Sequence, residues 1–271
     1  MFFQDLSEYF PAGDGGGPFE AARERAQAEL SGVGPRASLP GAGVGVLGEK
    51  LVHLTLKYYI EPLEICHEIP VGGFVADIKN AGGVVEIQTG GLSSMRRKLC
   101  LFMDLCPVTV VYPAVMRKYI SWIDPGTGEC SKPRKAPKES GASDALKELY
   151  GLRDMLGSGG GRLTVRVMFL DAVEYRTPSK NGGHGRGSRR AERFPLRLRG
   201  EVTLKGPRDY RALTPEGLTE NFTIAEYAKA AGISKFAASL CAGTLTAAGA
   251  IARTGKKGRA FAYSILGQAV L

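Results

Sequence analysis

The spacing of hydrophobic residues between positions 48 and 113 changes from a helical period to a strand-like one. Leu51, Leu54 and Leu56, followed by Tyr58 and Tyr59, predict a helix over about 48–61. Short apolar or alternating runs follow, bounded by Gly-rich turn signals. The predicted order is helix, three strands, helix and strand, with the strands at 67–71, 74–78 and 84–89, the second helix at 93–105 and the last strand at 108–112.

The middle of the chain continues this α/β pattern. It predicts strands at 118–123, 163–175 and 194–204, and a helix at 144–156. A cluster of arginines lies in and just after the Gly-rich stretch 179–193. Its members are Arg186, Arg189, Arg190, Arg193, Arg197 and Arg199. They either add a positive surface for a polyanion or form an ordinary solvated loop, and the sequence leaves both interpretations open.

The last fifty residues predict two short helices followed by a hairpin. Thr223 and Glu226 have the spacing of a capping box, in which each side chain bonds the other residue's backbone amide. Ser234 then caps a second helix that runs to about residue 248. Two strand-like runs, 250–254 and 259–265, are joined by a Gly-Lys-Lys-Gly turn.

The first 46 residues lack such a pattern. Gly15–Gly17 and the Pro- and Gly-rich stretch 35–45 interrupt regular structure. Between them, residues 19–30 predict a short, exposed helix. We therefore expect 1–46 to be a disordered N-terminal tail.

Charge and cysteine content narrow the class of protein. The 271 residues carry 36 Lys and Arg against 27 Asp and Glu, a net charge of +9, which favours a polyanionic partner. The five cysteines include no Cys-x-x-Cys pair, so we expect reduced thiols, mostly in the core, and no zinc site or disulfide framework. No apolar run is long enough to cross a bilayer and no secretory signal is evident, so we expect a cytoplasmic protein with no membrane association.

Four polar residues form the candidate catalytic cluster: Glu49, Asp77, Glu86 and Gln88. A hairpin would set Asp77 and Glu86 side by side, as Mg²⁺ or Mn²⁺ requires of carboxylate ligands. Gln88 shares a strand face with Glu86 and would orient water or phosphate, while Glu49 would support the metal. The alternative is that Asp77 only leads a turn and Glu86 is an exposed strand residue. A charge on a central strand, however, needs a partner or a metal.

The element order and these residues resemble the PD-(D/E)xK nuclease superfamily. The resemblance covers residues 48–113, with Asp77 followed by Glu86-Ile87-Gln88, a Glu-x-Gln variant of the usual Glu-x-Lys. It implies a restriction-endonuclease-like α/β core with an αβββαβ order, within a domain at 47–213 that carries additions. It also implies Asp77 and Glu86 as ligands of Mg²⁺ or Mn²⁺. The neutral Gln88 cannot supply a cation to the developing charge, which bears on activity.

Residues 221–266 resemble a winged helix-turn-helix domain, a fold that places its second helix in the major groove of DNA. The basic residues that suit phosphate contacts in this domain are Lys235, Lys256, Lys257 and Arg259. Arg96, Arg97 and Lys98, at the start of the helix after the candidate cluster, either touch the DNA backbone or form a solvated face. The second helix is rich in Ala, Ser and Thr, which predicts little direct reading of bases.

Together these patterns predict a metal-dependent DNA endonuclease directed to DNA by a winged helix. The expected partner is DNA, and a homodimer is left open. The alternatives are a non-catalytic DNA-binding regulator with a degenerate nuclease fold, and a protein–protein adaptor. Metal-dependent cleavage separates the first alternative from the enzyme, and the absence of salt-dependent DNA affinity would indicate the second.

Overall fold

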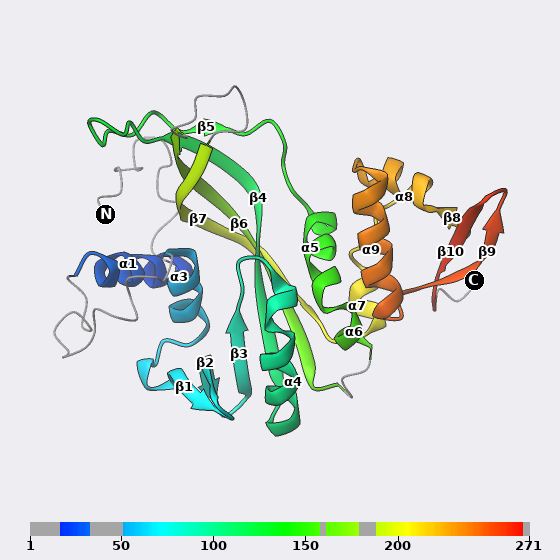
Figure 1. Cartoon of the computed structure of the whole chain (residues 1–271), viewed down its shortest axis with the longest axis horizontal. Coiled ribbons are helices and arrows are strands. Elements are labelled where there is room, and N and C mark those ends of the chain that lie inside the picture. The colour runs from blue at the N-terminus through cyan, green and yellow to red at the C-terminus, as the bar shows by residue number, and fades with distance from the viewer. Residues whose placement is uncertain (1–16, 33–50, 158–160, 179–187, 268–271) are drawn as a thin grey trace. The chain divides into compact units, whose positions relative to one another are not determined.

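The computed structural model describes residues 17–32, 51–157, 161–178 and 188–267 (Figure 1). It is a mixed α/β structure built around one large sheet, with a second, small sheet near the C-terminus. Two compact units share the chain. Unit 1 consists of Met1–Ile69, Val115–Glu139 and Met168–Glu201, and unit 2 of Pro70–Ala114, Ser140–Val167 and Val202–Leu271.

The seven-stranded sheet has the order β1-β2-β3-β4-β6-β7, and β5 pairs with β4. Its strands are β1 (His67–Val71), β2 (Phe74–Asn80), β3 (Gly83–Ile87), β4 (Val108–Trp122), β5 (Arg134–Lys135), β6 (Leu163–Pro178) and β7 (Ser188–Leu204). The hairpin β2–β3 is antiparallel, and β3 runs parallel to β4. A parallel neighbour needs a crossover connection, which α4 (Arg96–Leu105) supplies after the short η3 (Leu92–Met95).

The order of helix, three strands, helix and strand is confirmed over residues 51–122. The first helix is α3 (Leu51–Ile60), and β1 has the predicted bounds. The two strands predicted at 108–112 and 118–123 are one 15-residue strand, β4. Its intervening Pro113 and Ala114 are both apolar, so no polar turn separates the two runs, and the chain continues as a strand.

Helix α1 (Pro18–Leu30) is part of the core of unit 1, so the exposed helix of a disordered tail was a wrong prediction. It packs beside α3, with Phe19, Ala22 and Ala26 buried (Figure 1). Its small residues Ala22 and Ala26 are four apart, and they let the two helices approach closely. The rest of the predicted tail, 1–16 and 33–46, lies outside the described residues.

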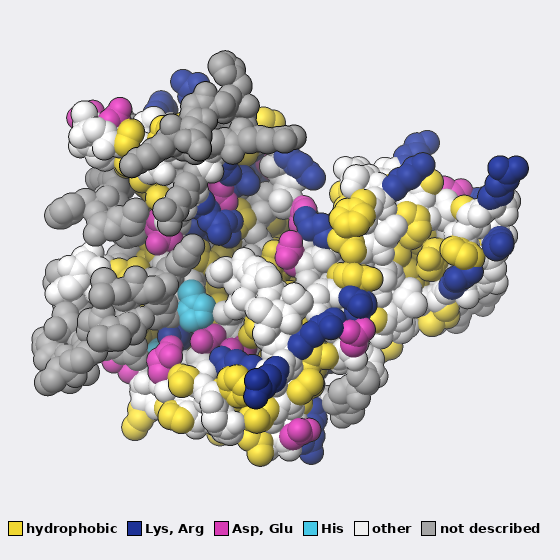
Figure 2. Space-filling view, viewed as in Figure 1, with side chains coloured by type: hydrophobic (Ala, Val, Ile, Leu, Met, Phe, Trp, Pro, Cys, Tyr) yellow, Lys and Arg dark blue, Asp and Glu magenta, His cyan; other side chains and the backbone are white. Residues whose placement is uncertain are grey.

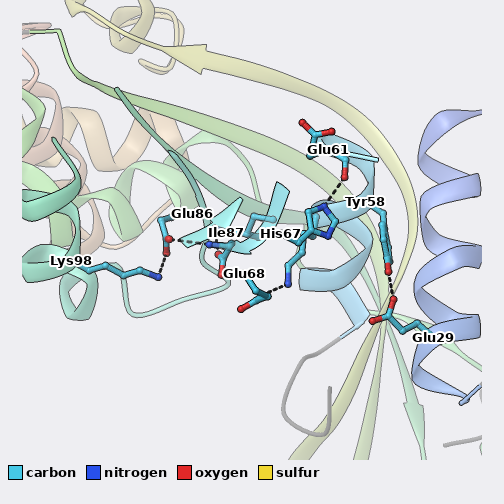
Figure 3. A network of polar contacts seen from close by, with 10 residues as sticks. Glu29, Tyr58, Glu61, His67, Glu68, Glu86, Ile87 and Lys98 are labelled. Carbon is cyan, nitrogen blue, oxygen red and sulfur yellow. Dashed lines mark hydrogen bonds and ion pairs between the residues drawn. The ribbon is translucent and has the colours of Figure 1, made fainter. Parts of the chain in front are cut away.

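Polar pairs stabilise this unit inside its apolar core. The Tyr58 hydroxyl donates a hydrogen bond to the buried Glu29, and a His67 ring nitrogen lies 2.7 Å from the Glu61 carbonyl (Figure 3). The fully buried Lys57 pairs with Glu68. Glu68 has a left-handed φ of 53°, an unfavourable conformation for a residue with a side chain. The buried cation therefore has its counter-charge at a strained backbone position.

In unit 2 a second group of helices packs around the C-terminal segment. These are α5 (Ala142–Leu149), η4 (Tyr150–Leu152), α6 (Arg153–Leu156), α7 (Pro207–Arg211), α8 (Ile224–Ala231) and α9 (Lys235–Ala247). The predicted helix at 144–156 is thus three short segments. Gly141 is the N-cap of the first, and the Asp144 carboxylate accepts a hydrogen bond from the Gly141 amide. The small sheet has the order β8 (Phe222–Thr223), β10 (Ala260–Ile265), β9 (Ile251–Lys257).

All five cysteines are free thiols, as predicted, but their placement in the core was a wrong prediction. Only Cys241 is buried; Cys66, Cys106 and Cys130 are half-buried, and Cys100 is exposed. Cys100 follows Leu99 on α4, so it turns away from the side on which Leu99 packs. Among the described helices, none is long and apolar enough to span a membrane.

Candidate functional site

The antiparallel hairpin β2–β3 brings Asp77 and Glu86 into direct contact across the two strands. The register pairs Ile78 with Val85, so Asp77 lies opposite Glu86. The Asp77 amide donates to Glu86 Oε1 over 3.2 Å, and the Ile87 amide donates to Asp77 Oδ2 over 2.7 Å. Each carboxylate therefore accepts a hydrogen bond from a backbone amide of the hairpin, and the hairpin alone fixes the positions of both side chains.

Glu86 is buried, which excludes the interpretation of an exposed strand residue. Burial, and then the nearby Asp77 carboxylate, raise the pKa of Glu86 to about 7. A hydrogen bond from Lys98 acts in the opposite direction: its Nζ lies 2.6 Å from Glu86 Oε2 (Figure 3). Glu86 is therefore poised to change protonation near neutral pH, which is characteristic of groups at functional sites.

Lys98 comes from α4, the helix that crosses over between β3 and β4. The sequence suggested a DNA contact or a solvated face for it, and the structure gives it a partner in the carboxylate cluster instead. The helical period of α4 could have indicated that Lys98 lies next to the buried side of the helix. Leu99 and Phe102 face the core, and Lys98 lies beside them, with Nζ 5.6 Å from the Phe102 ring. What the period could not indicate is that the long Lys98 side chain extends from α4 to Glu86 on β3.

The remaining residues of the predicted cluster do not join it. Glu49 lies outside the described residues. The Gln88 side chain, just past the end of β3, donates from Nε2 to the carbonyl of Gly90 over 2.5 Å. Arg96 donates to the Gly151 carbonyl over 2.7 Å and pairs with Asp154 at 2.8 Å, while Arg97 is exposed.

Two carboxylates suit a hard divalent cation. Mg²⁺ commonly takes one or two protein carboxylates and fills its other positions with water and substrate phosphate. The like charges of Asp77 and Glu86 contribute to the raised pKa of Glu86, and a cation between them would relieve that repulsion. In the part of the chain that the structure describes, no group of three or more His, Cys, Asp or Glu forms a fuller metal cage. The residues present therefore fit an open magnesium-type site rather than a closed zinc site.

The C-terminal segment has the predicted caps. Thr223 accepts at its hydroxyl from the Glu226 amide, and the Glu226 carboxylate accepts from the Thr223 amide over 2.7 Å. Ser234 caps α9 by accepting from the Ala237 amide over 3.2 Å. Between the helices Gly232 adopts a left-handed φ of 63°, which ends α8 and turns the chain.

The middle of α9 packs against α5 rather than facing solvent (Figure 1). Thr244 donates from its hydroxyl to the Leu146 carbonyl over 2.8 Å, and Cys241 donates from Sγ to the Ser143 carbonyl over 3.2 Å. A Cβ on Gly243 would lie 2.5 Å from the Tyr150 ring. The exposed part of α9 is mainly its first turn, with Lys235, Phe236 and Ser239.

The hairpin β9–β10 exposes cations beside hydrophobic side chains (Figure 2). The Arg253 guanidinium lies 3.0 Å above the centre of the exposed Phe261 ring, and Lys256 Nζ lies 5.8 Å from it. Lys257 pairs with Glu226 at 2.6 Å. Of the predicted DNA contacts, Lys235, Lys256 and Arg259 are exposed and have no ion pair within the described residues.

The described fold is that of a mixed α/β protein with two adjacent carboxylates at one hairpin, Glu86 buried and Asp77 half-buried. A family model described as a domain of unknown function, DUF8091, matches residues 50–205, and the chain belongs to this family. An uncharacterized protein of Treponema pallidum (strain Nichols) is 28% identical over 132 residues, which cover 48% of this chain and 51% of that protein. The chain thus matches about half the length of this relative. No solved structure matches the chain.

Proposed function

We propose that this protein is a metal-dependent nuclease that hydrolyses phosphodiester bonds of DNA. The observation that carries the proposal is the cluster Asp77–Glu86–Lys98. In it, two carboxylates on the neighbouring strands β2 and β3 lie beside one lysine of α4. The order β1-β2-β3-β4, with β3 and β4 parallel, supports the restriction-endonuclease-like core that the sequence suggests.

Asp77 and Glu86 would hold Mg²⁺ or Mn²⁺ through their carboxylate oxygens, and metal binding would require both to be ionised. The bound ion would activate a water ligand and neutralise charge on the phosphate. Because deprotonation of Glu86 is centred at about pH 7, we expect metal affinity to rise through neutral pH. Asp77 is held in place by the Ile87 amide, so it needs no rearrangement to bind.

Lys98 would supply the positive charge that Gln88 lacks. Its ammonium group lies 2.6 Å from Glu86, so it is fixed beside the proposed metal position and could stabilise charge on a phosphate oxygen. Gln88, held by the Gly90 carbonyl, would be left to orient water or phosphate through its amide oxygen. This arrangement removes the main argument for a degenerate site, since the cation is present on α4.

The C-terminal segment would bring DNA to the enzyme as a winged helix-turn-helix. Because α5 covers the middle of α9, the free surface consists of the first turn of α9 and the hairpin β9–β10. Arg253, Lys256 and Arg259 on the hairpin would bind phosphates, and Phe261 offers a face on which a base could stack. This surface favours binding to the backbone with little dependence on sequence.

The test is cleavage of plasmid, linear and single-stranded DNA with Mg²⁺, with Mn²⁺ and with EDTA. Asp77→Asn and Glu86→Gln should abolish metal-dependent cleavage while leaving DNA affinity intact in EDTA. Arg97→Gln, an exposed neighbour of Lys98 on α4, serves as the charge-loss control. DNA binding without cleavage under every condition would overturn the nuclease and favour a DNA-binding regulator.

A further inference from the structure

Strand β6 carries two buried carboxylates, Asp171 and Glu174, that pair with guanidinium groups of β6 and β7. Glu174 accepts from Arg176 over 2.8 Å and from Arg193 over 2.7 Å. Asp171 pairs through Oδ2 with Arg199 at 2.8 Å and with Arg197 at 3.2 Å. All six residues belong to unit 1. Each carboxylate therefore orients two arginines, and bonds of this charged kind hold a guanidinium in one plane.

Glu174, Arg193 and Arg197 lie on the face of the sheet opposite the α1–α3 core. Val173 and Tyr175 of β6, and Phe194 and Leu196 of β7, pack in that core. Because side chains alternate between the two faces of a strand, Glu174 projects to the other face. The same alternation places Arg193 and Arg197 there, and the Arg193–Glu174 ion pair agrees with it. Arg197 also reaches Asp171, although that residue is two positions from the core residue Val173.

The face has more positive than negative charge. Lys118 on β4 and Arg190 on β7 approach Glu174 only to 3.9 Å, beyond hydrogen-bonding distance. Together with the four arginines that pair with Asp171 and Glu174, six cations of the described residues approach these two carboxylates. Six cations carry more charge than these two carboxylates can neutralise, so positive charge is left over for a ligand.

The two signs of charge also differ in depth. The side chains of Asp171 and Glu174 are 1% and 3% exposed, whereas those of Arg197 and Arg190 are 52% and 42% exposed. Hydrogen bonds from Arg176 and Arg193 outweigh burial and lower the pKa of Glu174 to about 2, so this anion persists at neutral pH. Solvent and ligands therefore meet the cations, which the buried anions hold in fixed positions.

We propose that this face of β4, β6 and β7 binds the phosphodiester backbone of a nucleic acid. The cations extend along β7 from Arg190 to Arg199, roughly 30 Å at about 3.3 Å per residue, which exceeds a single phosphate group and suits a row of them. Guanidinium groups bind phosphate oxygens in pairs, and backbone contacts position a duplex without reading its sequence. The inference rests on the proposed function for its choice of DNA, but it does not require cleavage.

The experiment measures the affinity of the full chain for a fluorescent 30-base-pair duplex and a 30-nucleotide single strand, in EDTA, from 50 to 300 mM salt. The double variant Arg190→Gln/Arg197→Gln removes the two most exposed cations of the face and leaves Arg176, Arg193 and Arg199 to satisfy the carboxylates. The salt slope is the change in the logarithm of the binding constant per tenfold change in salt. Its magnitude should fall by about 2 in the double variant, because each lost phosphate contact on duplex DNA removes ~0.9. Affinity at 100 mM salt should fall at least tenfold.

The matched control is Lys138→Gln/Arg208→Gln, which removes the same charge from two exposed positions outside the face. Its salt slope should stay within about 0.5 of the wild type. If the wild type cuts DNA but the Arg190/Arg197 variant binds DNA like the control variant, this inference is overturned and the proposed function stands. If the salt slope of the double variant falls but the wild type never cuts DNA, the proposed nuclease activity is overturned and the DNA-binding role of this face is supported. If polyglutamate displaces the labelled DNA as well as unlabelled DNA of the same total charge does, the assignment of the ligand as a phosphodiester backbone is overturned.

Discussion

Lys98 Nζ lies 2.6 Å from Glu86 Oε2, although the two residues are twelve positions apart and belong to a helix and a strand. This pair joins α4 to the hairpin β2–β3 and gives a buried carboxylate a fixed counter-charge. Replacing Lys98 with Met would keep much of the side-chain volume but leave Glu86 without that charge. If the protein is the nuclease proposed here, cleavage should fall at least about 100-fold.

The control for this prediction is Arg97→Gln on the same helix. Arg97 is exposed, so its variant should retain cleavage within about threefold. Fluorescence-based cleavage assays on both proteins, with folding checked by urea unfolding, separate a chemical role from a structural one. If Lys98→Met retains full cleavage activity, Lys98 has no role in the reaction.

The pKa of Glu86 predicts how stability depends on pH. Its carboxyl group binds a proton more tightly in the folded protein, with a pKa of about 7, than the usual value of 4.5 in the unfolded chain. The stabilisation is therefore complete below pH 4.5 and is lost as pH rises through 7. Wild type should lose on the order of 2–3 kcal/mol between pH 5 and 8 from this group, and Glu86→Gln should not.

Urea unfolding at pH 5 and pH 8 measures this difference directly. A second arm adds Mn²⁺ at pH 8, which should stabilise wild type if the ion binds the ionised pair, and should not stabilise Glu86→Gln. Identical pH profiles for the two proteins would mean that Glu86 titrates at an ordinary pKa.

Gly243 offers a test of the packing between α9 and α5. Within a helix, Ala is normally more stable than Gly by about 1 kcal/mol. Here a Cβ would lie 2.5 Å from the Tyr150 ring, so we expect Gly243→Ala to destabilise the protein by about 1–3 kcal/mol. In a Tyr150→Ala background the same change should become stabilising, and thermal unfolding of the four proteins gives the coupling. A stabilising Gly243→Ala in the wild-type background would contradict the close contact.

The ion pairs of Glu174 predict a large effect on stability. Glu174 is buried and satisfies Arg176 and Arg193, so Glu174→Ala leaves both guanidinium groups without their main partner. We expect a loss of about 3–5 kcal/mol, as for one removed partner of a buried pair. Urea unfolding at neutral pH checks this, with Glu139→Ala as control. Glu139 also contacts two cations, Arg117 and Lys135, but at the surface, so its loss should change stability far less than the loss of Glu174.

The capping box of α8 gives a smaller, local prediction. The Thr223 hydroxyl accepts from the Glu226 amide at the N-terminus of the helix. Thr223→Ala should cost about 1 kcal/mol, whereas Thr223→Ser keeps the hydroxyl and should be close to neutral. Hydrogen exchange of the amides in 224–228 should quicken in the Ala variant alone. Equal exchange in both variants would show that the cap does not stabilise this helix.

The sequence predicted the features that depend on neighbours in the chain. The hairpin beside Asn80–Gly83, which places Asp77 opposite Glu86, and the caps Thr223 and Ser234 all follow from local rules. The sequence could not show contacts between distant segments. The burial of α1 depends on α3, and the Lys98–Glu86 pair depends on how α4 lies on β3.

The same limit explains the wrong expectations. Alanine-rich α1 has a weak helical stripe, because alanine adds little to the hydrophobic pattern even when it is fully buried, as Ala26 is. Cysteine is often buried, but Cys100 lies on the outer side of α4, and only the orientation of the helix decides this. The Arg-rich segment remained ambiguous because its counter-charges, Asp171 and Glu174, lie on another strand.

The hydrogen bonds from Cys241 and Thr244 to the backbone of α5 also determine where the chain can be divided. A protein shortened at residue 220 would lose α9 and leave the Ser143 and Leu146 carbonyls without these donors. The segment 221–266 is therefore a partner in folding and not a detachable module. Heating should melt α5 and α9 in one transition, and an isolated fragment of residues 221–266 should be markedly less stable than the same residues in the full chain.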